Sequence, residues 1–265
     1  MGKQRTFYNN IMPLNKDEHK DLRLKIDNNY SIFSNTNALP IAGVEFIEAS
    51  REHAIAFIDY LNEGIIPVYI LGLRDNENLL IDSDNSWKYD YVPAFVRRYP
   101  YIMIEPNEES KSIVCIDADY EGINDPEGAL IFTHSDGETK PAPQLESAME
   151  MLNDFSAQLT RTREFTKRLE EYDLLQEISP QINLEDGRNF SIGGIYTIDE
   201  KKLLELEDEK ALTLYRSGEM AWIYNHLASI SNLLRLANFI PAEKNKTKKA
   251  TKKKKVINKD KDTLH

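Results

Sequence analysis

Residues 87–119 combine aromatic, cationic and anionic side chains more densely than any other stretch of the sequence. Aromatic rings with a polar tip offer flat amphipathic surfaces, which are typical of recognition sites. We therefore predict a ligand- or partner-binding site here, and its candidate residues are Trp87, Tyr91, Arg97, Arg98, Tyr99, Asp117 and Asp119. The alternative is an aromatic corner that closes a sheet and is held by an arginine, because most buried aromatic residues serve packing.

The two arginines of this stretch are adjacent, so their side chains point in different directions on a helix or on a strand. We expect Arg97 and Arg98 to have different roles, one structural and one facing a ligand. A partly buried guanidinium without an anion is costly. At least one of the two should therefore lie within salt-bridge distance of a carboxylate.

Patterns typical of catalysis or metal binding are weak. The five histidines are isolated, and the single cysteine, Cys115, cannot build a zinc site. Cys115 with His134 or His226 could form a nucleophile and its base, and the alternative is an inert buried thiol. Asp117 and Asp119 could bind a cation or exchange protons, and the alternative is a solvated strand end. We predict no catalytic residue, no metal site and no cofactor.

Charge is divided unevenly along the chain of 265 residues, whose net charge is −11. Residues 243–265 contain 10 lysines and 3 acidic residues and carry +7, so residues 1–242 carry −18. An acidic body repels a phosphate backbone, and we expect no specific nucleic-acid partner. The lysine-rich tail should be disordered and solvated. Contact of the tail with nucleic acid, anionic lipid or the acidic body is the alternative.

The length of the apolar runs bears on location. The longest have five to seven residues, whereas a membrane-spanning helix needs about 20, so no transmembrane segment is predicted. The N-terminal residues lack the apolar region of a cleavable signal peptide. One cysteine allows no intramolecular disulfide, which fits a reducing compartment. We expect a cytoplasmic protein, and the alternative is a cell-surface protein exported without a cleavable signal.

The first half of the chain predicts an antiparallel sheet. Segments rich in branched and aromatic residues follow one another with short turns between them. Connections this short join antiparallel neighbours and cannot contain a parallel crossover. The pattern predicts a meander of about five or six strands, at residues 54–60, 67–71, 79–82, 101–105, 112–117 and, at an edge, 129–133.

The second half predicts mainly helices. Apolar residues recur every three or four positions over residues 145–170, which indicates one long helix. A shorter amphipathic helix is predicted at 219–239, with Leu227 and Leu234 buried. The predicted fold class is therefore α+β, an antiparallel β-sheet meander covered by the long helix and the C-terminal helix.

A β-hairpin should separate these two helices. Its strands are predicted at 181–184 and 189–192, because Asp186 and Gly187 between alternating runs are a strong hairpin signal. Asp199 follows a further strand-like segment, and it should cap a short helix.

Several segments resemble the SapC family of bacterial proteins, and the resemblance covers about residues 7–240. They are LNKDEHKDLRLK, NALPIAGVEF, PVYILGLRDNENLLID, WKYDYVPAFVRRYP, CIDAD, GGIYTIDEKKL and SGEMAWIYNHLASISNLLRL. The resemblance is most specific in the aromatic and Arg-Arg-Tyr-Pro segment. We expect a single α+β domain resembling SapC over residues 1–242, followed by the disordered lysine-rich tail at 243–265.

The resemblance implies a bacterial protein associated by name with surface-layer loci, with no established enzymatic activity and no assigned catalytic residues. The leading hypothesis is a non-enzymatic binding or accessory protein, linked to surface-layer or cell-envelope biology, with a protein or small-molecule partner. One alternative is a small-molecule enzyme or ligand-binding domain that uses residues 87–119. A second alternative is a surface-layer component.

Overall fold

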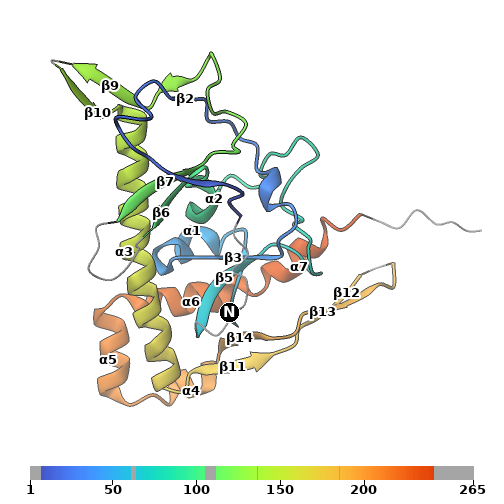
Figure 1. Cartoon of the computed structure of the whole chain (residues 1–265). Coiled ribbons are helices and arrows are strands. Elements are labelled where there is room, and N and C mark those ends of the chain that lie inside the picture. Colours follow the sequence, from blue (N-terminus) through green and yellow to red (C-terminus); the bar gives the residue numbers. More distant parts are fainter. Residues whose placement is uncertain (1–6, 61–63, 105–111, 136, 185, 242–265) are drawn as a thin grey trace, which may run out of the picture.

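The structure is a computed structural model that describes residues 7–60, 64–104, 112–135, 137–184 and 186–241. Two antiparallel sheets of the described part lie beside one long helix (Figure 1). The arrangement confirms the α+β class, with antiparallel strands covered by a long helix and by C-terminal helices. The tail predicted to be disordered, 243–265, lies outside the described residues.

The larger sheet has five antiparallel strands in the order β11-β14-β4-β5-β3. Its strands are β3 (Ala38–Pro40), β4 (Ala54–Asp59), β5 (Ile65–Ile70), β11 (Leu175–Ile178) and β14 (Ile195–Ile198). The first four residues of β4 are all buried, because both faces of this central strand are covered, and the strand is therefore almost continuously apolar. Pro40 lies in the edge strand, where a missing backbone donor is tolerated.

A second sheet has three antiparallel strands in the order β1-β7-β6. Its strands are β1 (Ile11–Pro13), β6 (Tyr101–Ile104) and β7 (Ile113–Asp117). The neighbours predicted from short connections do pair, β4 with β5 and β6 with β7. The two pairs belong to different sheets, however, and distant strands complete each sheet: β1 joins β7, and β14 joins β4.

Two predicted strands differ from the structure. Residues 79–82 form no strand, and Ile81 makes a single bridge to Trp87. The segment predicted at 129–133 divides into two short strands with different partners. β8 (Ala129–Leu130) pairs with β2 (Arg23–Leu24), and β9 (Phe132–Ser135) pairs with β10 (Glu138–Pro141).

The longest helix, α3 (Pro143–Glu171), runs beside both sheets (Figure 1). It begins at a proline, whose fixed φ suits the first helical turn. Its N-terminal half contributes Leu145 and Leu152 to an apolar cluster with the three-stranded sheet. Its C-terminal half contributes Phe165 and Leu169 to the main core around the five-stranded sheet. The predicted apolar stripe is thus confirmed, and it serves two separate cores.

The predicted C-terminal helix is divided into α6 (Glu219–Ser229) and α7 (Asn232–Ala237). α6 packs on β4 and β14 and covers part of the five-stranded sheet. The chain turns between the two helices, so the apolar stripe of α6 does not continue along α7. Leu233 is 3% exposed, whereas Leu234 is 63% exposed. The prediction that Leu234 is buried is therefore wrong, and Leu227 is half-buried.

Polar side chains of α6 and α7 bond the backbone beside β4. The ring of His226 is fully buried, with Nδ1 3.0 Å from the carbonyl oxygen of Ile55. Ser229 Oγ accepts the backbone N–H of Ile55, and Asn232 donates to the carbonyl oxygen of His53. These side chains therefore satisfy backbone groups that the sheet leaves unpaired.

Local signals in the second half are confirmed. β12 (Gln181–Asn183) and β13 (Asn189–Ser191) form the predicted hairpin, with Gly187 at a φ of 89°, which favours glycine. The carboxylate of Asp199 caps α4 (Glu200–Leu204) by accepting two backbone N–H groups. The next helix, α5 (Asp208–Arg216), follows Glu207, which occupies its N-cap position.

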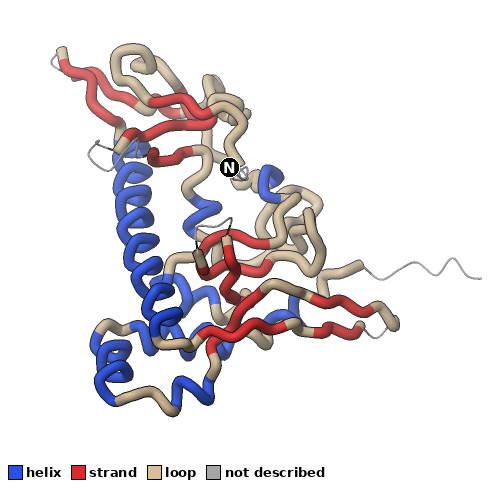
Figure 2. Tube along the Cα trace, turned by 60° about the horizontal axis from the view of Figure 1, so that its bottom comes forward, coloured by secondary structure: helices blue, strands red, loops and turns tan. Residues whose placement is uncertain are grey.

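Short helical segments lie in the connections that precede β3, β4 and β6. They are η1 (Ser31–Phe33), η2 (Gly43–Glu45), α1 (Phe46–Ala49) and α2 (Ala94–Arg97). A Cβ at Gly43 would lie 2.3 Å from the Trp222 ring, so only glycine allows η2 to approach α6 this closely. The Gly43 N–H also donates to Thr162 of α3. Figure 2 shows α2 between the two sheets, beside α3.

Candidate functional site

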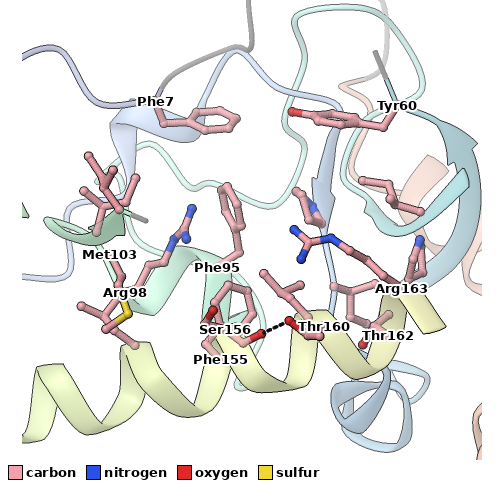
Figure 3. A pocket seen from close by; sticks show the side chains of 18 of the residues that line it. Phe7, Tyr60, Phe95, Arg98, Met103, Phe155, Ser156, Thr160, Thr162 and Arg163 are labelled. Carbon is pink, nitrogen blue, oxygen red and sulfur yellow. Dashed lines mark hydrogen bonds between the residues drawn. The ribbon is translucent and has the colours of Figure 1, made fainter. Parts of the chain in front are cut away.

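A cleft of about 620 Å³ lies between the two sheets, with α3 along its floor (Figure 3). Residues of β6 and the N-terminal strand region line one part, and residues of β3 and β5 line another. Its walls are mostly apolar, with hydroxyl groups and two arginines, Arg98 and Arg163, among them. This size and this lining are typical of small-molecule sites, which combine apolar walls with a few polar groups.

The side of α3 that faces the cleft carries a short polar stripe. Ser156, Thr160 and Arg163 follow one another at spacings of four and three residues, so they share one helix face. The hydroxyl of Thr160 donates to the carbonyl oxygen of Ser156 at 3.1 Å. Arg163 is exposed and forms no ion pair with any described residue. Its charge is therefore available to the cleft.

Arg98 follows α2 directly, and its guanidinium lies among three aromatic rings. The distances from its central carbon to the ring centroids are 4.1 Å for Phe95, 5.5 Å for Phe155 and 6.0 Å for Tyr8. Its Nε is buried and has no hydrogen-bond partner. Burial lowers the pKa of Arg98, and Tyr8 partly opposes this effect. An arginine nevertheless stays protonated in proteins, so the cleft holds a partly desolvated positive charge.

The adjacent arginine points elsewhere. Arg97 is exposed, lies 5.9 Å from the ring centroid of Tyr91, and does not line the cleft. The expectation that the two neighbours face different ways is confirmed. The expected carboxylate partner is not found among the described residues, where no carboxylate lies within salt-bridge distance of either arginine. Arg98 is stabilised by aromatic faces instead, which attract a cation through the ring quadrupole.

Tyr91 is held by a buried carboxylate. Glu45 is 6% exposed, and its Oε1 accepts hydrogen bonds from Tyr91 at 2.6 Å and Tyr69 at 3.0 Å. The backbone N–H groups of Ala94 and Ala42 donate to the same carboxylate. Burial, followed by the nearby Glu45, raises the pKa of Tyr91. Glu45 thereby fixes the start of α2, and α2 in turn positions Arg98.

Tyr99, Asp117 and Asp119 lie on the other side of this region. The fully buried carboxylate of Asp117 accepts backbone N–H groups of Asn9 and Asn10 at 3.0 Å, and Tyr99 donates to it at 3.3 Å. Burial, followed by the nearby Asp117, raises the pKa of Tyr99. Asp119 is exposed, and with Tyr99 it lines a second, smaller pocket of about 250 Å³. Asp117 therefore anchors the N-terminal strand region.

Trp87 belongs to the main core. Its ring is 8% exposed and stacks on His53 at a centroid distance of 6.1 Å. His53 is also surrounded by Tyr69, Tyr89 and Tyr91, and both of its ring nitrogens are buried without a hydrogen-bond partner. Burial lowers the pKa of His53 to about 4. Of the predicted site residues, the structure thus brings Arg98 into the large cleft and Tyr99 and Asp119 into the small pocket.

The cysteine and histidines occupy separate structural settings. Cys115 is buried in β7, and burial raises the pKa of its thiol. His226 Nε2 lies 2.9 Å from the hydroxyl of Thr197 and accepts the backbone N–H of Ile198, so both ring nitrogens have partners inside the core. Burial lowers the pKa of His226 to about 4. His134 is exposed and lies 2.9 Å from the Thr139 hydroxyl.

Sequence reasoning missed Arg163 and the cleft wall around it. Arg163 lies on the charged side of a long amphipathic helix, where an arginine ordinarily faces solvent. The available signal was the spacing of Ser156, Thr160 and Arg163, which interrupts that charged side with hydroxyls. Within the described ranges, no three His, Cys, Asp or Glu side chains are grouped to hold a metal ion. No helix there has the length and apolar character needed to cross a membrane.

Comparison with family models gave a match, whereas comparison with individual proteins and structures did not. Neither a search of curated proteins nor a search of solved structures gave a match. The family model described as SapC matches residues 14–236, which include α3, both sheets except β1, and every described segment that lines the cleft from β3 onward. The match covers most of the chain, and the chain therefore belongs to the SapC family.

Proposed function

We propose that this protein is a non-enzymatic binding protein that holds an organic anion in the cleft between its two sheets. The observation that carries this proposal is the guanidinium of Arg98, which is partly desolvated, has a buried Nε without a partner, and lacks a carboxylate among the described residues. A buried polar donor without a partner costs free energy. An anion in the cleft would neutralise the guanidinium charge, because Arg98 is one of the residues that line it.

The electrostatic setting supports an organic anion of modest size. Residues 1–242 carry a net charge of −18, so the protein as a whole repels anions. Two arginines that line one cleft oppose this field locally. The apolar walls, which include Ile41, Met103 and Leu159, suit the hydrocarbon part of such a ligand. A small inorganic anion would leave these walls unused.

The ionisable groups of the cleft support binding over catalysis. Among its described lining residues they are the two arginines and the tyrosines Tyr8 and Tyr60. Burial raises the pKa of Tyr8 to about 12, and its hydroxyl donates to the carbonyl oxygen of Tyr101 at 2.8 Å. A general base acts best when its pKa lies near the working pH. Arginines and a tyrosine of this kind are suited to hold an anion in place.

The direct test measures binding of decanoate by calorimetry. Wild type should bind it, and Arg98→Gln should bind it at least about tenfold more weakly, since a charge-assisted hydrogen bond contributes about 1.5–3 kcal/mol. Arg97→Gln is the control, because it removes the adjacent charge outside the cleft. Melting temperatures establish that each variant is folded. Equal binding by Arg98→Gln and wild type, or no binding by wild type, would overturn the proposal.

The biological setting is the second part of the proposal. The name of the SapC family supports an accessory role in bacterial surface-layer or cell-envelope biology, with the protein acting in the cytoplasm. Cell fractionation followed by capture of its partner tests this setting. Recovery in the cytoplasmic fraction together with an envelope or surface-layer component is the expected result. Recovery at the cell surface would instead favour a surface-layer component.

A further inference from the structure

We infer that the ligand of the cleft is an elongated apolar dianion, with an acidic group at each end and a hydrocarbon segment between them. This inference rests on the proposed function, because it concerns the same cleft. It depends on a second observation, the placement of Arg163 relative to Arg98. The two guanidinium groups come from separate elements, α3 and the residue after α2.

Figure 3 shows how the two arginines enter the cleft. In this view they reach in from opposite sides, with Phe95 between them, and Phe7 and Tyr60 lie across the space from α3. Arg98 is in the more enclosed part, since burial lowers its pKa and its Nε is shielded from solvent. Arg163 is exposed. One acidic group would therefore be held in an enclosed place and the other near solvent.

The pairing of charges argues for two acidic groups. Each arginine lacks an ion-pair partner among the described residues, and the described lining holds no carboxylate. A ligand with one acidic group at Arg98 would leave Arg163 without a counter-charge. A second acidic group there adds another charge-assisted hydrogen bond, which is about twice as strong as a neutral one. The hydroxyl of Thr160, one turn before Arg163, adjoins the same end.

The surfaces between the two arginines are largely apolar side chains, with the hydroxyls of Ser156 and Thr160 beside them. Phe95 and Phe155 lie beneath the guanidinium of Arg98, and Leu159 continues the floor toward Arg163. A hydrocarbon linker gains from leaving water against the apolar side chains, which make up most of this lining. Linear α,ω-dicarboxylates have this chemistry. The same chemistry occurs in a chain with one phosphate and one carboxylate end, and the test compares both.

The experiment uses the full chain and calorimetry with linear α,ω-dicarboxylates of increasing length, from adipate to hexadecanedioate. Each is compared with the monocarboxylate of equal carbon number, and the best length is repeated with one carboxylate replaced by phosphate. The best dianion should bind at least about tenfold more tightly than its monocarboxylate, which corresponds to one additional charge-assisted bond.

Arg163→Gln is the decisive variant. It should remove the advantage of the dianion, because the second acidic group then lacks its arginine, while monocarboxylate binding should weaken by a smaller factor, because Arg98 still holds the first acidic group. Lys167→Gln is the control, since it removes an exposed charge from the same helix outside the cleft. A dianion advantage that is absent, or that survives in Arg163→Gln, overturns this inference while the proposed function stands. Failure of wild type to bind any probe overturns both.

Discussion

Arginines of α3 occupy two opposite situations. On the side of α3 that contacts the start of α6, Arg168 donates through Nε to Glu219 at 3.0 Å and through a second nitrogen to the same carboxylate. Arg161 donates to the carbonyl oxygen of Ser217 at 2.7 Å and lies over the Trp222 ring. In the cleft, Arg163 and its neighbour across the space, Arg98, have no carboxylate partner among the described residues.

The difference separates positions that hold the fold together from positions that are open to a ligand. Next to α6, the protein supplies an acceptor for each guanidinium, so the charges contribute to tertiary structure. In the cleft, the described residues around the arginines offer aromatic rings and hydroxyls. The positive charge of each guanidinium is therefore not neutralised by a carboxylate of these residues. Groups kept unpaired at some cost in stability are characteristic of functional sites.

The largest effect should come from breaking the ion pair beside α6. Arg168→Ala leaves Glu219, which is 1% exposed, as a buried charge without its cation. Removal of one partner of a buried pair costs about 3–5 kcal/mol of the free energy of unfolding. Arg163→Ala on the same helix should change it by less than about 0.5 kcal/mol. Urea denaturation measures both, and similar losses in the two variants would remove the distinction.

A second comparison concerns the apolar support of the same region. Leu233→Ala should lower the free energy of unfolding by about 2–5 kcal/mol, because Leu233 is 3% exposed in the main core. The adjacent Leu234→Ala should cost less than about 0.5 kcal/mol, since Leu234 is 63% exposed. The reverse order would mean that α7 is rotated relative to the structure.

The pH dependence should distinguish the two buried histidines, His53 and His226, from the exposed His134. Burial lowers the pKa of His53 and of His226 from 6.5 to about 4. Between these values the unfolded state binds more protons than the folded state, so the free energy of unfolding falls as the pH falls from 6.5 to about 4. Each histidine should contribute about 3 kcal/mol to this loss. Urea denaturation at several pH values, with exposed His134→Gln as the control, tests the prediction.

Substitution of the two buried histidines compares a ring without hydrogen-bond partners, that of His53, with a hydrogen-bonded ring, that of His226. His53→Phe should be tolerated at pH 7, because both ring nitrogens lack partners and the ring lies among aromatic side chains. His226→Phe should be destabilised at pH 7 by about 1–3 kcal/mol, since it leaves the buried backbone groups of Ile55 and Ile198 unpaired. Equal costs at pH 7 would contradict the assigned bonding.

The smallest effect is expected in the cleft without ligand. Arg98→Met should keep the free energy of unfolding within about 1 kcal/mol of wild type, because an apolar side chain of similar length replaces a charge that has no carboxylate partner among the described residues. Chemical denaturation at pH 7 checks this. A loss comparable with that of Arg168→Ala would show that Arg98 is a structural residue.

Local features of the fold could be predicted from the sequence. The 29-residue helix α3 follows from its apolar spacing, the β12–β13 hairpin from Asp186 and Gly187, and the start of α4 from Asp199. Each depends on residues within a few positions of one another, where backbone preferences and hydrophobic periodicity act directly. The same holds for the divergence of Arg97 and Arg98, because adjacent side chains cannot share a direction.

The division of the strands into two sheets could not be predicted, because it depends on pairing between strands that are distant in sequence. The sequence contains strands β4 to β7, but β1 and β14 assign them to two sheets, and that choice depends on contacts between distant segments. Among the described residues Arg98 has no carboxylate partner, and the buried carboxylates of Glu45 and Asp117 accept hydrogen bonds from backbone N–H groups and tyrosines. Arg163 faces the cleft only because α3 spans both cores. Sequence spacing determines which side chains share an element, whereas tertiary packing determines which elements enclose a common space.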